Sequence, residues 1–264
     1  MSRITKTFAT LKKKKRAALI TYIMAYDPSR AVCEKILQAL PEAGADIIEL
    51  GMPFSDPMAE GPTIQEAAKR ALKVGSTMKG VLQILSNFRK KDQKTPVILM
   101  GYFNPILHYG VQNFVRDAKA AGADGCIIVD LPPEEEKEFT VFAYKSGLDL
   151  IKLSAPTTDK ERAKVIYKNA RGFAYYVSIT GITGTKTADF EEVKKHLKVI
   201  RSSTKLPIAV GFGIKTPEQV AEVAKFADGV VVGSAIVNLI GKNRARAVKP
   251  VTNLVNRLSQ ALKK

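Results

Sequence analysis

The feature that most constrains the fold is a repeated alternation of short apolar runs with longer helical patterns. Eight apolar runs recur along the chain, and each is followed by apolar residues at helical spacing. The runs lie at 18–25, 47–50, 97–100, 126–129, 148–153, 173–177, 208–210 and 230–232. Strands that are apolar on both faces and alternate with helices are typical of a buried parallel sheet. The pattern therefore predicts an α/β fold.

Three of these runs begin with the same junction. A helical pattern ends in small residues, an aspartate follows, and the apolar run starts directly after it, as in AGAD at 43–46 and 121–124 and FADG at 226–229. Such a sequence is typical of a short connection from a helix to a strand. Eight such units in 264 residues favour a closed (β/α)8 TIM barrel over an open doubly wound sheet.

The helical patterns complete this architecture. They lie at 29–43, 62–74, 111–121, 134–146, 159–169, 189–202, 216–226 and 247–262. Additional patterns at 3–15 and 78–91, and a short helix that can begin at Ser234, predict an extra N-terminal helix and extra helices after strands 2 and 8. Because no low-complexity linker divides the chain, we expect one barrel domain over 1–264.

Composition excludes several kinds of site. The formal charge of +17 favours an anionic partner, although most lysines fit solvated helix faces. The absence of Trp and the few aromatic residues among the basic runs argue against nucleic-acid binding. Cys33 and Cys126 are far apart, and His108 and His196 are the only histidines. The sequence therefore offers almost no material for a metal cluster, a disulfide framework or a Ser-His-Asp triad.

The N-terminal segment superficially resembles a secretion signal, because a basic run at 12–16 precedes an apolar run. That run contains Thr21 and Tyr22, and Asp27 and Pro28 follow where small residues of a cleavage site would stand. No stretch approaches the length of a membrane span. We therefore expect a cytoplasmic protein that does not enter a membrane.

Glycines after the last three strands predict a phosphate site. Active sites of such barrels lie at the carboxyl ends of the strands. Gly184, Gly211, Gly213 and Gly233 follow strands 6, 7 and 8, and Ser234 can begin a helix whose N-terminus points inward. Backbone N–H groups at these places bind phosphate in many barrels.

Two carboxylates lie near the same end of the predicted barrel. Glu49 interrupts an apolar strand, and Glu60 lies in the turn-rich loop that follows. If Glu49 faced the helices, it could pair with a lysine; if it faced the lumen, burial would raise its pKa and allow it to move protons. Residues that could line an apolar pocket between the carboxylates and the phosphate, or equally serve as barrel core, are Tyr22, Ile64, Met100, Tyr102, Ile127, Val129, Leu153, Tyr175 and Phe212.

With these residues placed, the chain resembles the tryptophan synthase α chain family. The resemblance rests on segments that span nearly the whole barrel: IELGMPFSDPMAEGPTIQ at 48–65, GYFNPIL at 101–107, VDLPPEE at 129–135, APTT at 155–158 with the later Arg162, YVSITGITG at 176–184, GFGIKTPEQV at 211–220 and GSAIV at 233–237. The first of these and the PTT segment are specific to that family.

The resemblance implies a lyase that cleaves indole-3-glycerol phosphate to indole and glyceraldehyde 3-phosphate, without a metal or a cofactor in this chain. It implies that Glu49 is the acid–base residue, that Glu60 holds the indole N–H, and that Tyr175 lies beside the catalytic carboxylate. Phe212 is expected to pack on the indole ring. The remaining substrate-binding residues that the resemblance implies are Thr183, Gly184, Gly213, Gly233 and Ser234.

This chain departs from the family pattern at two positions. The family usually has Asp where this chain has Glu60, so the carboxylate is kept on a stem that is one methylene longer. It also has Gly where this chain has Tyr26. Because tyrosine does not readily adopt a positive φ, we expect a differently shaped loop at Tyr26.

The resemblance also implies a partner, a tryptophan synthase β chain that carries pyridoxal phosphate, in an α-β-β-α heterotetramer. Loops 53–62 and 179–190 are expected to close over the substrate and touch that partner. Two alternatives stay open. One is a phosphate-using aldolase that forms a Schiff base through Lys152, although strand alternation turns Lys152 outwards. The other is a non-catalytic protein, either a nucleic-acid binder or an activating subunit.

Overall fold

The strands form one parallel sheet that curls into a nearly closed barrel. The computed structural model describes residues 1–178, 190–211 and 213–263. In this part of the chain the strands are β1 (Ala18–Met24), β2 (Ile47–Gly51), β3 (Val97–Gly101), β4 (Gly125–Ile128), β5 (Asp149–Leu150), β6 (Lys152–Ser154), β7 (Ala174–Val177), β8 (Ile208–Gly211) and β9 (Gly229–Val232). Their order in the sheet is β5-β4-β3-β2-β1-β9-β8-β7-β6, with every pair parallel. The predicted TIM barrel is confirmed.

The predicted fifth strand is divided in two. Its first half, β5, pairs with β4, and its second half, β6, pairs with β7. Ile151 lies between them, and its backbone N–H donates to the carbonyl oxygen of Cys126 at 2.8 Å. The segment 149–154 therefore changes partners at one residue and joins the two ends of the sheet.

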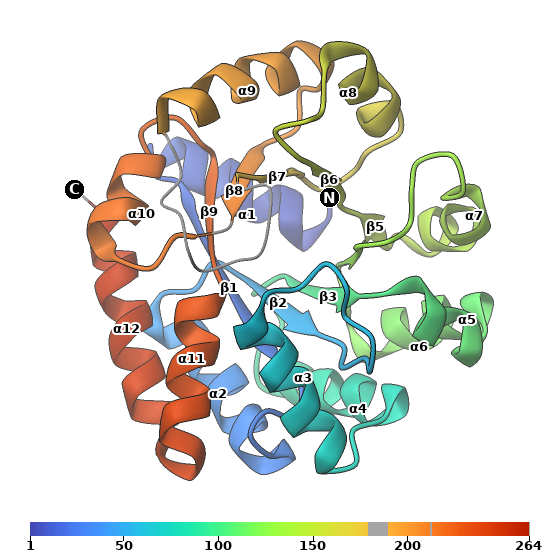
Figure 1. Ribbon diagram of the computed structural model, residues 1–264, viewed down its shortest axis with the longest axis vertical. Helices are drawn as coiled ribbons and strands as arrows, with labels where there is room; N and C mark the ends of the chain where they lie inside the picture. Colours follow the sequence, from blue (N-terminus) through green and yellow to red (C-terminus); the bar gives the residue numbers. More distant parts are fainter. Residues whose placement is uncertain (179–189, 212, 264) are drawn as a thin grey trace.

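Helices surround the strands (Figure 1). They are α1 (Arg3–Lys13), α2 (Arg30–Ala43), α3 (Pro62–Lys73), α4 (Met78–Arg89), α5 (Phe103–Tyr109), α6 (Val111–Ala121), α7 (Lys137–Ser146), α8 (Lys160–Tyr167), α9 (Phe190–Ser203), α10 (Pro217–Val223), α11 (Ser234–Asn243), the 3-10 turn η1 (Arg244–Arg246) and α12 (Val248–Ala261). The extra helices α1, α4 and α11 agree with the sequence prediction. The short α5 was not predicted; Pro105 lies in its first turn, where the missing N–H removes no intrahelical hydrogen bond.

The aspartates of the three repeated junctions have the same structural role. Each accepts the backbone N–H at the start of a neighbouring strand at 2.8–2.9 Å: Leu19 donates to Asp46, Val97 to Asp124 and Ile208 to Asp228. Each also forms an ion pair with an arginine, which is Arg16, Arg89 and Arg201 in the same order. The recurring aspartate therefore satisfies a backbone donor that no strand ladder reaches.

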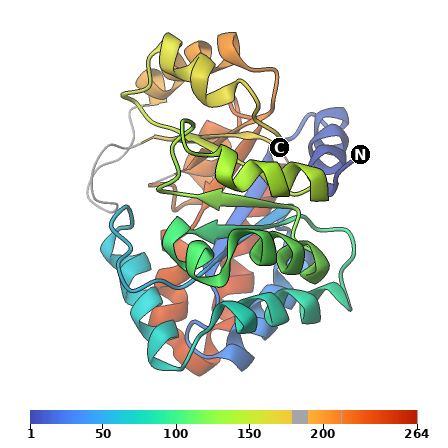
Figure 2. The same cartoon turned by 90° about the vertical axis from the view of Figure 1, so that its right-hand side faces the viewer.

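Helix α1 covers the amino-terminal end of the barrel. Its buried face carries Ile4, Phe8 and Leu11, and the Phe8 ring lies 5.7 Å from that of Phe173, just before β7. Arg3 donates to Asp124 at 3.0 Å. Figure 2 shows α1 on the right-hand side, at the opposite end of the barrel from the loop between β2 and α3. Because α1 covers that end, the opposite mouth is the end at which a substrate can enter.

Candidate active site

Glu49 is a buried carboxylate on the inner surface of the barrel. It lies in β2 between Tyr22 of β1 and Ile98 of β3 in the strand register, and the residue is 1% exposed. Among the described residues its Oε1 atom has no hydrogen-bond partner. Burial, reinforced by the nearby charge of Glu60, raises the pKa of Glu49 to about 8. Of the two orientations considered from the sequence, the structure has Glu49 facing the lumen.

Glu60 is held at the mouth by hydrogen bonds to the backbone around it. The Glu60 N–H donates to the Pro57 carbonyl oxygen at 3.0 Å, and Gln65 Nε2 donates to the Glu60 carbonyl oxygen at 2.9 Å. The preceding N–H, of Ala59, donates to the Tyr102 hydroxyl at 3.0 Å. The loop from β2 to α3 thus delivers the Glu60 carboxylate into the barrel, where burial raises its pKa to about 7.

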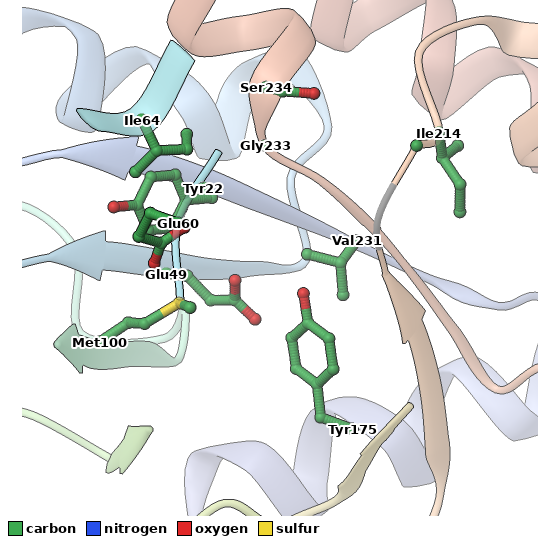
Figure 3. A pocket seen from close by; sticks show the side chains of 11 residues that line it. Tyr22, Glu49, Glu60, Ile64, Met100, Tyr175, Ile214, Val231, Gly233 and Ser234 are labelled. Carbon is green, nitrogen blue, oxygen red and sulfur yellow. The ribbon is translucent and has the colours of Figure 1, made fainter. Parts of the chain in front are cut away.

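Two tyrosine hydroxyls share the pocket with these carboxylates. Figure 3 shows the Tyr175 hydroxyl and the Glu49 carboxylate pointing into the same space. Burial is the largest cause that raises the pKa of both Tyr22 and Tyr175 well above the usual value, and Glu49 and Glu60 add to the effect. Both hydroxyls therefore remain protonated and can act as hydrogen-bond donors.

Backbone groups form the opposite side of the pocket. Helix α11 begins at Ser234 with Gly233 as its N-cap, and no side chain within the described residues caps it. Gly213 has φ of 78°, a conformation that favours glycine. A Cβ added at Gly233 would lie 3.3 Å from the Cβ of Tyr22, so the chain passes close to β1 there. The open N–H groups at the start of α11 suit an anion.

These groups line one pocket at the carboxyl ends of the strands. Of the predicted site residues, the structure places nine around it: Tyr22, Glu49, Glu60, Ile64, Met100, Tyr175, Gly213, Gly233 and Ser234. Ile214 and Val231 also line it and were missed. Val231 could have been predicted, because side chains alternate along a strand and one of the two neighbours Val230 and Val231 must therefore face the lumen.

Other predicted site residues lie elsewhere. Ile127 pairs with Met100 in the strand register but is fully buried in the core, and Tyr102 anchors the loop through Ala59. Val129, which follows β4, and Leu153 of β6 line a separate groove. The remaining predicted residues, Thr183, Gly184 and Phe212, lie outside the described residues, as do 179–189 of the predicted second closing loop.

The expectation that Tyr26 would avoid a positive φ was wrong. Tyr26 has φ of 67°. Its ring is buried, and its hydroxyl lies so close to Gly80 that a Cβ there would be 1.8 Å away. The next residue, Asp27, is held by Arg70 of α3 through two hydrogen bonds of 2.7 and 2.8 Å. Packing and the ion pair hold the turn in a conformation that tyrosine alone disfavours.

Lys152 does not reach the pocket. Its ammonium group forms an ion pair with Glu136, which immediately precedes α7, outside the barrel. Burial lowers the pKa of Lys152 to about 8. Lys152 thus faces outwards, as strand alternation indicated, and the structure gives no support to a Schiff-base aldolase in this pocket.

In residues 1–178, 190–211 and 213–263, no cluster of three metal-ligating side chains occurs, and no helix has the length and apolar character to cross a membrane.

The fold and the pocket define a class of protein, a (β/α)8-barrel enzyme with two carboxylates in one pocket, facing an open helix N-terminus. The sequence matches the tryptophan synthase alpha chain family over residues 8–264, and the chain belongs to that family. It is a carbon–carbon lyase, the α subunit that cleaves indole-3-glycerol phosphate in L-tryptophan biosynthesis.

Solved structures agree with this assignment. The chain is similar to the tryptophan synthase alpha subunit of Legionella pneumophila strain Paris, with 44% identity, a TM-score of 0.91, and 99% and 98% of the two chains covered. A protein from Aquifex aeolicus VF5 has 39% identity, a TM-score of 0.92 and full coverage of both chains. Tryptophan synthase from Mycobacterium tuberculosis has 32% identity, a TM-score of 0.90, and coverage of 100% and 99%.

Proposed function

We propose that the pocket between Glu49, Glu60 and the start of α11 is where indole-3-glycerol phosphate is cleaved. The observation that carries this proposal is a pair of carboxylates in one pocket, one buried on a strand and one partly buried at the mouth, with the Glu49 Oε1 atom free of partners in the described chain. Their environments raise the pKa of Glu49 to about 8 and that of Glu60 to about 7. Near pH 7.5 Glu49 is therefore mostly an acid and Glu60 mostly an anion, which gives the two residues different roles.

The chemistry follows from these protonation states. Glu49 donates its proton to C3 of the indole ring while the Glu60 carboxylate accepts the ring N–H and offsets the positive charge on nitrogen. The Glu49 carboxylate then removes the proton from the adjacent glycerol hydroxyl. As the carbonyl of glyceraldehyde 3-phosphate forms, the C–C bond breaks and its electron pair returns to the ring, which releases indole. Glu49 ends protonated, so no co-reactant is needed. The Tyr175 hydroxyl points into the same space as this carboxylate and can stabilise its anionic form.

The phosphate of the substrate fits the opposite side of the pocket. The N-terminus of α11 offers uncapped backbone N–H groups and the positive end of a helix dipole. Gly213 and Gly233 leave room for a close approach to the backbone. We assign the phosphate to Gly213, Gly233 and Ser234 of the described residues.

We expect a bell-shaped pH profile. Indole release, as kcat/KM, should fall below about pH 7 as Glu60 gains a proton and above about pH 8 as Glu49 loses one. The measurement is indole formation from pH 5.5 to 9.5. In Glu60→Gln the acidic limb should disappear from the residual activity. This result would show that the limb comes from protonation of Glu60 and not of the substrate phosphate. A flat profile in the wild type would contradict this assignment.

A negative charge at the start of α11 should weaken substrate binding. Ser234→Asp is expected to raise KM by about a hundredfold, because it opposes the phosphate at close range. Ser234→Ala should change KM only slightly, since the backbone N–H groups remain. Asn238→Asp adds the same charge one turn along the exposed face of the helix and serves as the matched control. An equal KM in both aspartate variants would place the phosphate elsewhere.

We also propose that the chain acts in an α-β-β-α heterotetramer with a tryptophan synthase β chain, and that pyridoxal phosphate is bound by that partner. Two large apolar side chains support a docking surface at the mouth. Met58, in the loop that carries Glu60, is 79% exposed, and Leu107, in the helix after β3, is 47% exposed. Burying both against a partner would remove apolar surface from water. A cytoplasmic location accords with this biosynthetic role.

A further inference from the structure

The Tyr22 hydroxyl is a buried donor without a strong acceptor. Tyr22 is 6% exposed, and in the described part of the chain its hydroxyl has one hydrogen-bond contact, with the Sδ atom of Met24 at 3.9 Å. A thioether sulfur is a weak acceptor, whereas buried tyrosine hydroxyls usually have a good one. This hydroxyl is therefore available to another group in the pocket.

Two glycines leave room for the Tyr22 side chain. A Cβ added at Gly51, at the end of β2, would lie 2.2 Å from the Tyr22 hydroxyl oxygen. On the other side, a Cβ at Gly233 would lie 3.3 Å from the Tyr22 Cβ. The ring thus passes over Gly51, and its hydroxyl lies two residues beyond Glu49 along β2, toward the mouth of the barrel where Glu60 enters (Figure 3).

Glu60 is the acceptor best suited to this hydroxyl. After burial, the causes that raise the pKa of Tyr22 are the charges of nearby acidic groups: Glu60 first, then Glu49, Tyr102 and Asp27. Asp27 is already held by Arg70, and Tyr102 is itself a hydroxyl that accepts from Ala59. Of the two remaining carboxylates, Glu60 lies at the mouth, the side of Glu49 on which the Tyr22 hydroxyl lies over Gly51. Its longer stem also gives it a rotatable bond that a hydrogen bond would restrain.

We propose that Tyr22 is a positioning residue whose hydroxyl donates to the Glu60 carboxylate and holds it, as an anion, toward the ring N–H of the substrate. The inference rests on the proposed role of Glu60. A hydrogen bond to the ionised form favours that form, so Tyr22 opposes the effect of burial on Glu60. Tyr22 thereby extends the working range of the enzyme toward lower pH.

The test is the pH profile of Tyr22→Phe, which removes the hydroxyl and keeps the ring. The acidic limb of kcat/KM should move up by about one pH unit, with about a tenfold loss of activity at pH 6.5 and a much smaller loss near pH 8. Tyr109→Phe removes a hydroxyl that bonds to Asp117 on the surface helices, and it should leave the profile unchanged. Replacement of Tyr22 by 3-fluorotyrosine, a stronger donor of similar shape, should move the limb in the opposite direction.

A double-mutant cycle separates this role from packing. In the Glu60→Gln background, Tyr22→Phe should have less than about a twofold further effect, because the group it positions is no longer a carboxylate. A pH-independent loss in Tyr22→Phe, or a full additional loss in the Glu60→Gln background, would overturn the proposal while leaving the role of Glu60 intact. Full activity of Glu60→Gln alone would overturn both.

Discussion

Replacing Glu49 with Gln should abolish indole release while leaving the barrel folded. Glutamine keeps the size and polarity of the side chain but can neither give a proton to the indole ring nor take one from the glycerol hydroxyl. Because both proton transfers are assigned to Glu49, kcat should fall by about 10³-fold or more. The measurement is indole formation from indole-3-glycerol phosphate at pH 7.5. Glu66→Gln, an exposed glutamate on α3, is the matched control.

The same substitution should stabilise the protein as the pH rises. Glu49 keeps its proton in the folded state up to about pH 8, whereas an unfolded glutamate releases it near pH 4.5. The folded state therefore holds the extra proton between these values, and wild-type stability decreases with pH across that window. Glu49→Gln removes this penalty, so its free energy of unfolding should exceed that of the wild type by about 2–4 kcal/mol at pH 8 and by little at pH 4.5. Denaturant unfolding of both proteins at the two pH values measures this difference. In the indole-release assay described above, undiminished turnover by Glu49→Gln would disprove the catalytic role of Glu49.

The second large effect is expected at Glu60. Glu60→Ala should lower kcat/KM by about a hundredfold or more, because the ring N–H loses its acceptor and the charge on nitrogen is no longer offset. Glu60→Asp should keep or improve turnover, since the carboxylate remains on the shorter stem that the family usually carries. The measurement is the rate of indole release by both variants at pH 7.5.

The loop contacts provide a control for this series. Gln65 holds the Glu60 carbonyl oxygen, and Tyr102 accepts from the Ala59 N–H, so neither contact depends on the Glu60 side chain. The loop should therefore keep its conformation in Glu60→Ala and Glu60→Asp, which a crystal structure of each variant checks. If Glu60→Ala retained the wild-type rate, Glu60 would not be the second catalytic carboxylate.

Much of the fold could be predicted because burial in a parallel barrel leaves a clear sequence pattern. The apolar runs correspond to strands, and the repeated Gly-Ala-Asp junctions end helices at Gly44 and Gly122 in the left-handed conformation. The break of the fifth strand at Ile151 could not be predicted, because its apolar run is continuous and only the pairing partner changes. Helix α5 was missed because a seven-residue segment that contains a proline lacks a helical period.

The site was predictable where chemistry and strand position agreed. Glu49, Glu60 and the glycines after the last strands lie around one pocket because the carboxyl ends of parallel strands meet there. The positive φ of Tyr26 could not be predicted from local preference, since Tyr26 packs on Gly80 and the adjacent Asp27 is held by Arg70, and both Gly80 and Arg70 are distant in sequence. The weak acceptor of the Tyr22 hydroxyl, the sulfur of Met24, likewise could not be predicted from the sequence, because it depends on the orientation of the ring.

The central claim is that this pocket holds the substrate during cleavage, and a crystal structure of Glu49→Gln soaked with indole-3-glycerol phosphate tests it most directly. The variant should bind the substrate uncleaved. We predict the ring N–H within hydrogen-bond distance of the Glu60 carboxylate, the glycerol carbons beside residue 49, and the phosphate at the N–H groups of Gly233 and Ser234. A substrate bound with its phosphate away from α11, or with its ring N–H away from Glu60, would contradict the account.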